Sequence, residues 1–284
     1  MSTDVGIIGA GRVGSVLGAA LATAGYRVVA ASGASPLLRA TPVLPADEVA
    51  ARAGLLILSV PDDVLPGLVA GLAGTGSLRV GQIVAHTSGA HGLGVLAPAV
   101  VAGARPLALH PAMTFTGSAR DLDRLRKGVS FGVTAPADLR AYATRLVADL
   151  GGAVEWIPDE QRALYHAALA HGANHLVTLV NEAMDRLREA GVTHPERVLD
   201  PLLHAALDNA LALGDAALTG PVSRGDAGTV ARHLRVLPSE SVPAYRALAR
   251  RTADRAIAAG RLRPVDAEPL LGVLAGGTRD EVSS

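Results

Sequence analysis

The stretch that most constrains the fold is DVGIIGAGRVG, residues 4–14. A short apolar run typical of a buried strand leads directly into Gly9, Gly11 and Gly14, spaced Gly-x-Gly-x-x-Gly, and these glycines open a helical pattern. Glycine allows a tight turn there and lets a phosphate come close to the N–H groups at the start of the helix. An ordinary tight turn is the simpler interpretation, but in this context the spacing predicts a dinucleotide-binding site.

The first half of the chain repeats this alternation of strand and helix. Runs typical of strands lie at 4–9, 27–32, 54–60, 82–88, 105–111, 128–134 and 153–158, with helical patterns at 12–24, 46–53, 62–73 and 138–150. Near-continuous apolar strands separated by helices predict an α/β fold, a doubly wound parallel sheet of the Rossmann type with both faces covered. After Pro158 only helical patterns follow. We therefore predict a dinucleotide-binding domain over residues 1–158 and an all-helical domain over 159–284, whose last residues, 276–284, we expect to be disordered.

Charge and hydropathy argue against several classes of partner. Lys+Arg and Asp+Glu balance at 26 each, whereas nucleic-acid binding normally requires a basic excess. The longest aliphatic runs, such as LLILSV, are too short to span a bilayer, and the N-terminus leads almost at once into a strand. We expect a soluble, cytoplasmic protein that binds neither nucleic acid nor membrane.

The residue types available limit the chemistry of a site. The chain has no cysteine, and its one lysine, Lys127, lies in a polar loop, so a proton donor acting near pH 7 should be a histidine. His171 and His175 have the spacing of two metal ligands. However, the glutamate of the His-Glu-x-x-His motif is missing and no third ligand is obvious, so we predict no metal site.

The end of the second predicted strand indicates which dinucleotide binds. Enzymes that use NAD usually carry a carboxylate there for the ribose 2′-hydroxyl, but this chain has Ser32, and no carboxylate lies between Asp4 and Asp47. Ser32 could be an ordinary loop serine; alternatively it could bind a 2′-phosphate together with Ser35 and an arginine, Arg12 or Arg39. We predict NADP(H). The expected cofactor-binding residues are Gly9, Ala10, Gly11, Arg12, Val13, Gly14, Ser32, Arg39, Ser59, Val60, Pro61, Thr87 and Ser88.

Polar residues also follow two later strands and lie on one predicted helix. HTSG (86–89) and LHPAMTF (109–115) end their strands where ligands bind in such sheets, so His110 is either a structural or a functional histidine. In YHAALAHGANHLVTL (165–179), helical spacing places His171, Asn174 and His175 on one face. That face could simply be solvated, but it differs from the arginine- and aspartate-rich helices elsewhere, and we expect it to close the nicotinamide crevice.

Several motifs together carry a resemblance to a known family. GIIGAGRVG, SVPDD, HTSGAHG, LALHPAMTFTG, LYHAALAHGANHLVTL and ALTGPVSRGD resemble, over nearly the whole chain, an incompletely characterised family of Rossmann-like reductases with a helical C-terminal domain of unknown function. In architecture that family is similar to ketopantoate reductase, pyrroline-5-carboxylate reductase, prephenate dehydrogenase and 6-phosphogluconate dehydrogenase. HPAM resembles the His-Pro-Met loop of prephenate dehydrogenase, which implies a catalytic role for His110. Asn174 matches the asparagine of the 6-phosphogluconate and ketopantoate groups, but their catalytic lysine has no counterpart on this helix.

These observations predict an NADPH-dependent reductase that transfers hydride to a small 2-oxo compound bearing a carboxylate, with ketopantoate as the first candidate. Reduction of an imine of the pyrroline-5-carboxylate type and a non-catalytic dinucleotide sensor are the alternatives. We expect His110 to be the general acid, Asn174 to orient the carbonyl, and Ser88 and His171 to support them. The expected substrate-binding residues are Arg224, His175 and Asn209. The apolar helices at 169–180 and 202–213 predict a homodimer.

Overall fold

The structure, a computed structural model, describes residues 4–276. It forms two compact units that divide between His175 and Leu176. Most of the C-terminal tail that we expect to be disordered, from residue 277 on, lies outside the described residues.

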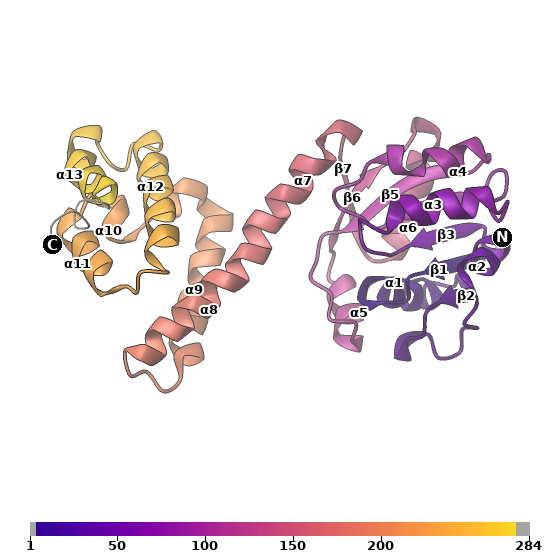
Figure 1. The fold of residues 1–284 in the computed structure, drawn as a ribbon, viewed down its shortest axis with the longest axis horizontal. Coiled ribbons are helices and arrows are strands. Elements are labelled where there is room, and N and C mark those ends of the chain that lie inside the picture. Colours follow the sequence, from indigo (N-terminus) through magenta and orange to yellow (C-terminus); the bar gives the residue numbers. More distant parts are fainter. Residues whose placement is uncertain (1–3, 277–284) are drawn as a thin grey trace, which may run out of the picture. The chain divides into compact units, whose positions relative to one another are not determined.

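The first unit is built on one seven-stranded sheet of order β2-β1-β3-β4-β5-β6-β7 (Figure 1). Its strands are β1 (Asp4–Ile8), β2 (Arg27–Ser32), β3 (Leu55–Leu58), β4 (Ile83–His86), β5 (Arg105–Pro111), β6 (Ser130–Thr134) and β7 (Ala153–Trp156). Its helices are α1 (Arg12–Thr23), α2 (Ala46–Arg52), α3 (Leu65–Gly74), α4 (Ala97–Val101), α5 (Ala119–Leu125), α6 (Arg140–Asp149) and α7 (Arg162–Leu169). The predicted Rossmann-type α/β fold is confirmed.

The sheet departs from the prediction in one pairing. Strands β5 and β6 are antiparallel, with His110 opposite Gly132, whereas the other neighbouring strands are parallel. The connection between them contains α5, which packs beside α1. The chain is therefore still at the carboxyl edge of β5 when β6 begins, and β6 has to run in the opposite direction. The prediction of a wholly parallel sheet was wrong at this point.

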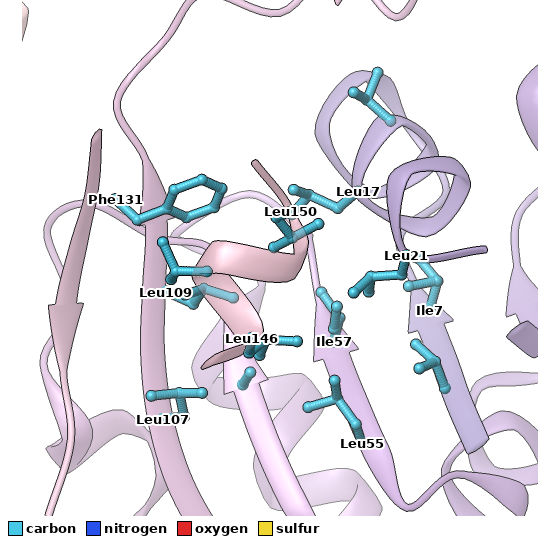
Figure 2. Packing of buried hydrophobic residues seen from close by; sticks show 14 of the residues in the cluster. Ile7, Leu17, Leu21, Leu55, Ile57, Leu107, Leu109, Phe131, Leu146 and Leu150 are labelled. Carbon is cyan, nitrogen blue, oxygen red and sulfur yellow. The ribbon is translucent and has the colours of Figure 1, made fainter. Parts of the chain in front are cut away.

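Both faces of the sheet are covered by apolar packing, because successive residues of each strand point to opposite faces. Ile7, Ile57 and Leu109 pack on one face with side chains of α1 and α6, as Figure 2 shows for the buried cluster around Leu21 and Leu146. The neighbouring strand residues, among them Ile8, Leu56 and Leu58, pack on the other face with α2, α3 and α4. This double layer holds the carboxyl ends of β1, β3, β4 and β5 in one row.

The second unit is helical. Its elements are α8 (His175–Glu189), which starts at the boundary, α9 (Pro195–Leu213), α10 (Gly220–Ser223), α11 (Ala227–Val236), α12 (Val242–Ala258) and α13 (Pro264–Ala275). Residues 176–276 contain no strand, and a buried core joins α10 to α13 around Val230, Ala253 and Leu270. Asp226 caps α11 by accepting a hydrogen bond from the Thr229 N–H at 2.9 Å. No helix within residues 4–276 combines the length and apolar character needed to cross a bilayer.

The region around the predicted domain boundary has two features of its own. The change from strands to helices falls near residue 158, where the prediction has it, but α7 packs on the sheet unit through Arg162 and Tyr165, so the compact units divide later. The boundary at 158/159 therefore stays a prediction.

Between α7 and α8, residues Ala170–Asn174 form a π-helical turn, so the uniform α-helical spacing assumed for this stretch does not hold.

Candidate active site

The glycine loop after β1 is shaped by contacts that only glycine permits. Gly9 has a φ of +90°, and a Cβ there would lie 2.2 Å from the Ser59 carbonyl oxygen. A Cβ on Gly14 would lie equally close to the Gly9 carbonyl oxygen. At Gly11, by contrast, a Cβ would meet no atom within 4 Å. Gly9 and Gly14 thus close the turn, and Gly11 leaves free space in front of the helix.

The start of α1 suits an anion. Its N-cap, Gly11, makes no side-chain cap, and no acidic residue occupies its first turn. Helix N–H groups at such an end attract phosphate. Arg12 is exposed there and lies beside Gly117 of the loop after β5, where a Cβ would be 3.1 Å from the Arg12 Cγ. The residues of this loop therefore fit a dinucleotide pyrophosphate.

The loop after β2 carries polar groups around a hollow. The Ser32 carbonyl accepts hydrogen bonds from the N–H groups of Gly9 and Ala10, each at 3.1 Å, which ties the end of β2 to the glycine loop. A hollow of about 400 Å³ follows, lined by Ala34, Ser35, Pro36, Leu38, Arg39, Thr41 and Val43. Arg39 is exposed, and no carboxylate lines the hollow. Its chemistry suits a phosphate better than a pair of ribose hydroxyls.

The predicted residues after β3 and β4 gather at the same edge. The Thr87 hydroxyl donates to the Ser59 hydroxyl at 3.3 Å, and Val60 lies beside Gly9. The Ser88 hydroxyl accepts from the N–H groups of Ala90 and His91, at 3.2 and 3.0 Å, so it holds its own loop. Asp62, in the same region, does not cap the next helix, because α3 begins only at Leu65.

His110, near the end of β5, is the centre of a polar cluster. Its Nδ1 lies 2.9 Å from the hydroxyl of Tyr165, and the two rings meet edge to face with centroids 5.6 Å apart. The ring of His166 lies 6.1 Å away. The pKa of His110 is lowered to about 4, chiefly by burial and next by the charge of Arg162, with His166 acting in the same direction and Asp62 in the opposite one. His110 is therefore a neutral imidazole at pH 7.

Two glycines make room for this cluster. A Cβ on Gly132 of β6 would lie 2.5 Å from the hydroxyl of Tyr165, and a Cβ on Gly89 would lie 2.6 Å from His166 Cδ2 and 3.1 Å from His110 Nε2. The first turns of α7 can therefore lie directly against the carboxyl end of the sheet. His110 is half-buried in this cluster, and its Nε2 makes no hydrogen bond within the described residues.

A buried arginine fixes α7 in this position. The side chain of Arg162 is 1% exposed and donates to the carbonyl oxygen of Ser88 at 2.5 Å and to that of Gly132 at 3.2 Å. It also donates to the Thr134 hydroxyl at 3.3 Å. Within residues 4–276 it forms no ion pair, and its Nε has no hydrogen-bond partner. Arginine keeps its proton even when burial lowers its pKa, so a positive charge without a carboxylate partner stands beside His110.

The structure brings some predicted residues together and not others. Tyr165 and His166, rather than His171 and Asn174, are the helix side chains in contact with His110. His171 and Asn174 lie on the exposed π-helical turn, where the Nδ1 atoms of His171 and His175 are 3.2 Å apart. In the second unit, Arg224 is exposed at the end of α10 and Asn209 is exposed on α9. The roles of these four and of His175 stay predictions.

Sequence reasoning missed three side chains of the cluster: Arg162, Tyr165 and His166. The available signal was the spacing of Arg162 and Tyr165, which are three apart and so share one face of a helix. What hid their importance is that their partners are glycines far away in the sequence, Gly132 on β6 and Gly89 in the loop after β4. Within the described residues, no group of three His, Cys, Asp or Glu side chains is placed to hold a metal ion.

Comparisons with known proteins agree with this architecture. Residues 2–111 match the Rossmann-like domain, and residues 129–252 match a domain of unknown function, DUF2520. No curated protein matches the chain.

Three solved structures share its fold. A Bacteroides fragilis protein described as a candidate NADP oxidoreductase has a TM-score of 0.74 at 22% identity, over 89% of this chain and 98% of that one. A reductive aminase from Aspergillus terreus, in complex with NADPH and ethyl levulinate, has a TM-score of 0.64 at 19% identity, over 92% and 95%. Pyrroline carboxylate reductase from Plasmodium falciparum, with NADP bound, has a TM-score of 0.61 at 12% identity, over 94% and 98%. The chain thus combines a Rossmann-like domain with a C-terminal DUF2520 domain, as its motifs predict.

Proposed function

We propose that the protein is an NADPH-dependent oxidoreductase that reduces a small carbonyl compound bearing a carboxylate, with ketopantoate as the first candidate substrate. The observation that carries the proposal is the position of His110. It stands at the carboxyl edge that the glycine loop also occupies, it is only half-buried, and its Nε2 makes no hydrogen bond within the described residues. The fold shared with an NADP-bound reductase and an NADPH-bound aminase supports it.

The groups proposed to hold the cofactor follow from the free space in front of Gly11 and from the hollow after β2. Gly11 and the start of α1 would receive the pyrophosphate, and Ser32, Ser35 and Arg39 would receive the 2′-phosphate. The nicotinamide supplies the hydride when bound. Val60 and Thr87 would then lie along the path from the phosphates toward His110.

His110 would bind the substrate oxygen as a neutral hydrogen-bond donor. A neutral imidazole can polarise a carbonyl without being protonated itself. The charge of Arg162 favours this substrate class, because negative charge develops on a carbonyl oxygen during reduction, whereas an imine is reduced as a cation that Arg162 would repel. Imine reduction, which the aminase and the pyrroline carboxylate reductase favour by analogy of fold, remains the second candidate.

A substrate panel tests the proposal. NADPH oxidation is followed at 340 nm with ketopantoate, other 2-oxo acids and cyclic imines, and NADPH binding is measured separately by its fluorescence. We expect turnover of a 2-oxo acid, loss of turnover in His110→Ala, and unchanged NADPH affinity in that variant. NADPH binding without any turnover would favour the non-catalytic sensor, and turnover of imines alone would favour the second candidate.

A further inference from the structure

We propose that Tyr165 supplies the proton that His110 delivers to the substrate, with the buried guanidinium of Arg162 as the countercharge for the tyrosinate. This inference rests on the proposed function. It assigns roles to two residues of α7 that face the sheet and that no motif singles out.

The hydrogen bond between the two rings defines the direction of the relay. If the Tyr165 hydroxyl donates to His110 Nδ1 across their 2.9 Å contact, the proton of the neutral imidazole is on Nε2. His110 is half-buried and its Nε2 makes no hydrogen bond in the described part of the chain, so Nε2 is the ring atom left to bind a ligand oxygen. The Tyr165 hydroxyl thus donates to Nδ1 of the ring, and the Nε2–H group on the other side of the ring is the donor left for the substrate.

A neutral His110 cannot act as the proton source alone. Giving up the Nε2 proton would leave an imidazolate unless Nδ1 gains a proton in the same step. The titratable and charged groups around His110 are Tyr165, Arg162 and His166 from α7 and Asp62 from the loop after β3. Of these, Tyr165 is the group hydrogen-bonded to Nδ1.

Arg162 supplies the charge that makes a transient tyrosinate tolerable. Its Cζ lies 5.8 Å from the centre of the Tyr165 ring, and within the described part of the chain it has no ion pair that would neutralise it. Burial raises the pKa of Tyr165, and the charge of Arg162 acts against that rise. Three hydrogen bonds, to β6 and to the loop after β4, hold the guanidinium in place, so its field is fixed before the substrate arrives.

The proposed step balances. As hydride reaches the carbonyl carbon and the C=O electron pair moves to oxygen, the Nε2–H bond breaks and its proton bonds to that oxygen. At the same time the O–H bond of Tyr165 breaks and its proton bonds to Nδ1. After the product leaves, Nε2 takes one proton from solvent water and Nδ1 returns its proton to the tyrosinate, which restores neutral His110 with its proton on Nε2 and neutral Tyr165.

The first test is a proton inventory on the wild-type enzyme, in which kcat is measured in mixtures of H₂O and D₂O. If two protons move in the rate-limiting step, the plot of kcat against the fraction of D₂O is curved, and if one proton moves it is straight. A straight line would therefore overturn the relay. This measurement needs no variant. Wild-type turnover in the same assay shows that the proposed function holds independently of the relay.

The second test uses Tyr165→Phe, with Tyr142→Phe on α6 as the matched control. We expect kcat to fall roughly 100-fold, within the range of a lost general acid, with unchanged NADPH affinity and a straight inventory. The control should keep wild-type kcat. Wild-type kcat in a folded Tyr165→Phe would refute the relay even if His110→Ala is inactive.

The third test separates charge from packing at Arg162. In a plot of kcat against pH, the fall at alkaline pH should report the ionisation of Tyr165. In Arg162→Met this fall should move to higher pH, because the cation that lowers the pKa of the tyrosine is gone. Arg162→Lys, which keeps the charge, should restore the fall toward its original position. A purely structural role for Arg162 predicts loss of stability in both variants with no movement of the fall.

Discussion

The phenol of Tyr165 occupies the space that a side chain at Gly132 would fill, since a Cβ there would lie 2.5 Å from the tyrosine hydroxyl. The glycine on β6 and the tyrosine on α7 are therefore a matched pair. Because Gly132 also stands opposite His110 in the antiparallel pairing of β5 with β6, its lack of a side chain lets one helix reach two strands.

Gly132→Ala should push Tyr165 away from His110. We expect a loss of about 1–3 kcal/mol in the free energy of unfolding, as is typical of overpacking, together with reduced turnover. The control is Gly94→Ala, where the added methyl group meets no atom within 4 Å. Thermal unfolding and kcat measure both effects, and a Gly132→Ala protein indistinguishable from the Gly94→Ala protein would contradict the packing argument.

Gly11→Val should abolish dinucleotide binding without unfolding the protein. The backbone at Gly11 has an ordinary φ of −72°, and a Cβ there meets open space, so the substitution obstructs only an incoming ligand. Gly67→Val on α3 also projects into open space and serves as the control. Titration of NADPH fluorescence should show binding in the control and none in Gly11→Val.

Ser32→Asp should shift the cofactor preference from NADPH toward NADH. A carboxylate at the end of β2 repels a 2′-phosphate and binds the ribose 2′-hydroxyl instead. The measurement is the ratio of the two dissociation constants in wild type and variant. Equal affinities in the wild type, or a preference for NADH, would show that Ser32 is an ordinary loop serine.

The stability of the protein should fall as the pH is lowered from about 6.5 to 4. Burial lowers the pKa of His86 to about 4 in the folded state, whereas the unfolded chain titrates near 6.5. Between pH 6.5 and 4, His86 is therefore protonated in the unfolded chain but still neutral in the folded protein. Its contribution to the free energy of unfolding, about 3 kcal/mol, is fully present above pH 6.5 and is lost as the pH falls toward 4. His110 acts in the same direction.

His86→Gln should flatten this dependence, as measured by urea unfolding at several pH values. A slope between pH 6.5 and 4 that is unchanged in the variant would mean that other groups cause it.

The protein should form a homodimer through α8 and α9. On these helices Val177, Leu202 and Leu211 are 62%, 62% and 80% exposed, which is unusual for large apolar side chains unless another surface covers them. Leu211→Glu should therefore give a monomer by light scattering at micromolar concentration. Val236→Glu on α11, at a position 79% exposed but outside these helices, should leave the mass unchanged. A monomeric wild type would refute the prediction.

The sequence was most informative where local periodicity decides the structure. The seven strands and the glycine loop follow from short apolar runs and from Gly9, Gly11 and Gly14. The reversal of β6 could not be predicted, because it depends on where α5 packs after leaving β5. The partners of His110 were missed for a related reason. Tyr165 fits against the sheet only because Gly132 has no side chain. Gly132 lies on β6, far from Tyr165 in the sequence, so the residues around the tyrosine do not indicate this contact.

Arg162 also has a consequence for local unfolding of the protein. Its guanidinium donates to oxygens of β6 and of the loop after β4, two segments separated in the sheet by β5. Breaking the first turn of α7 away from the sheet would leave a buried cation and several carbonyl oxygens without partners, so the start of this helix and the sheet should open as one cooperative unit. In hydrogen–deuterium exchange, the hydrogen-bonded amides of the first turns of α7 should exchange as slowly as those of β4 and β6. The π-helical turn at 170–174 has no such anchor, so its amides should exchange much faster.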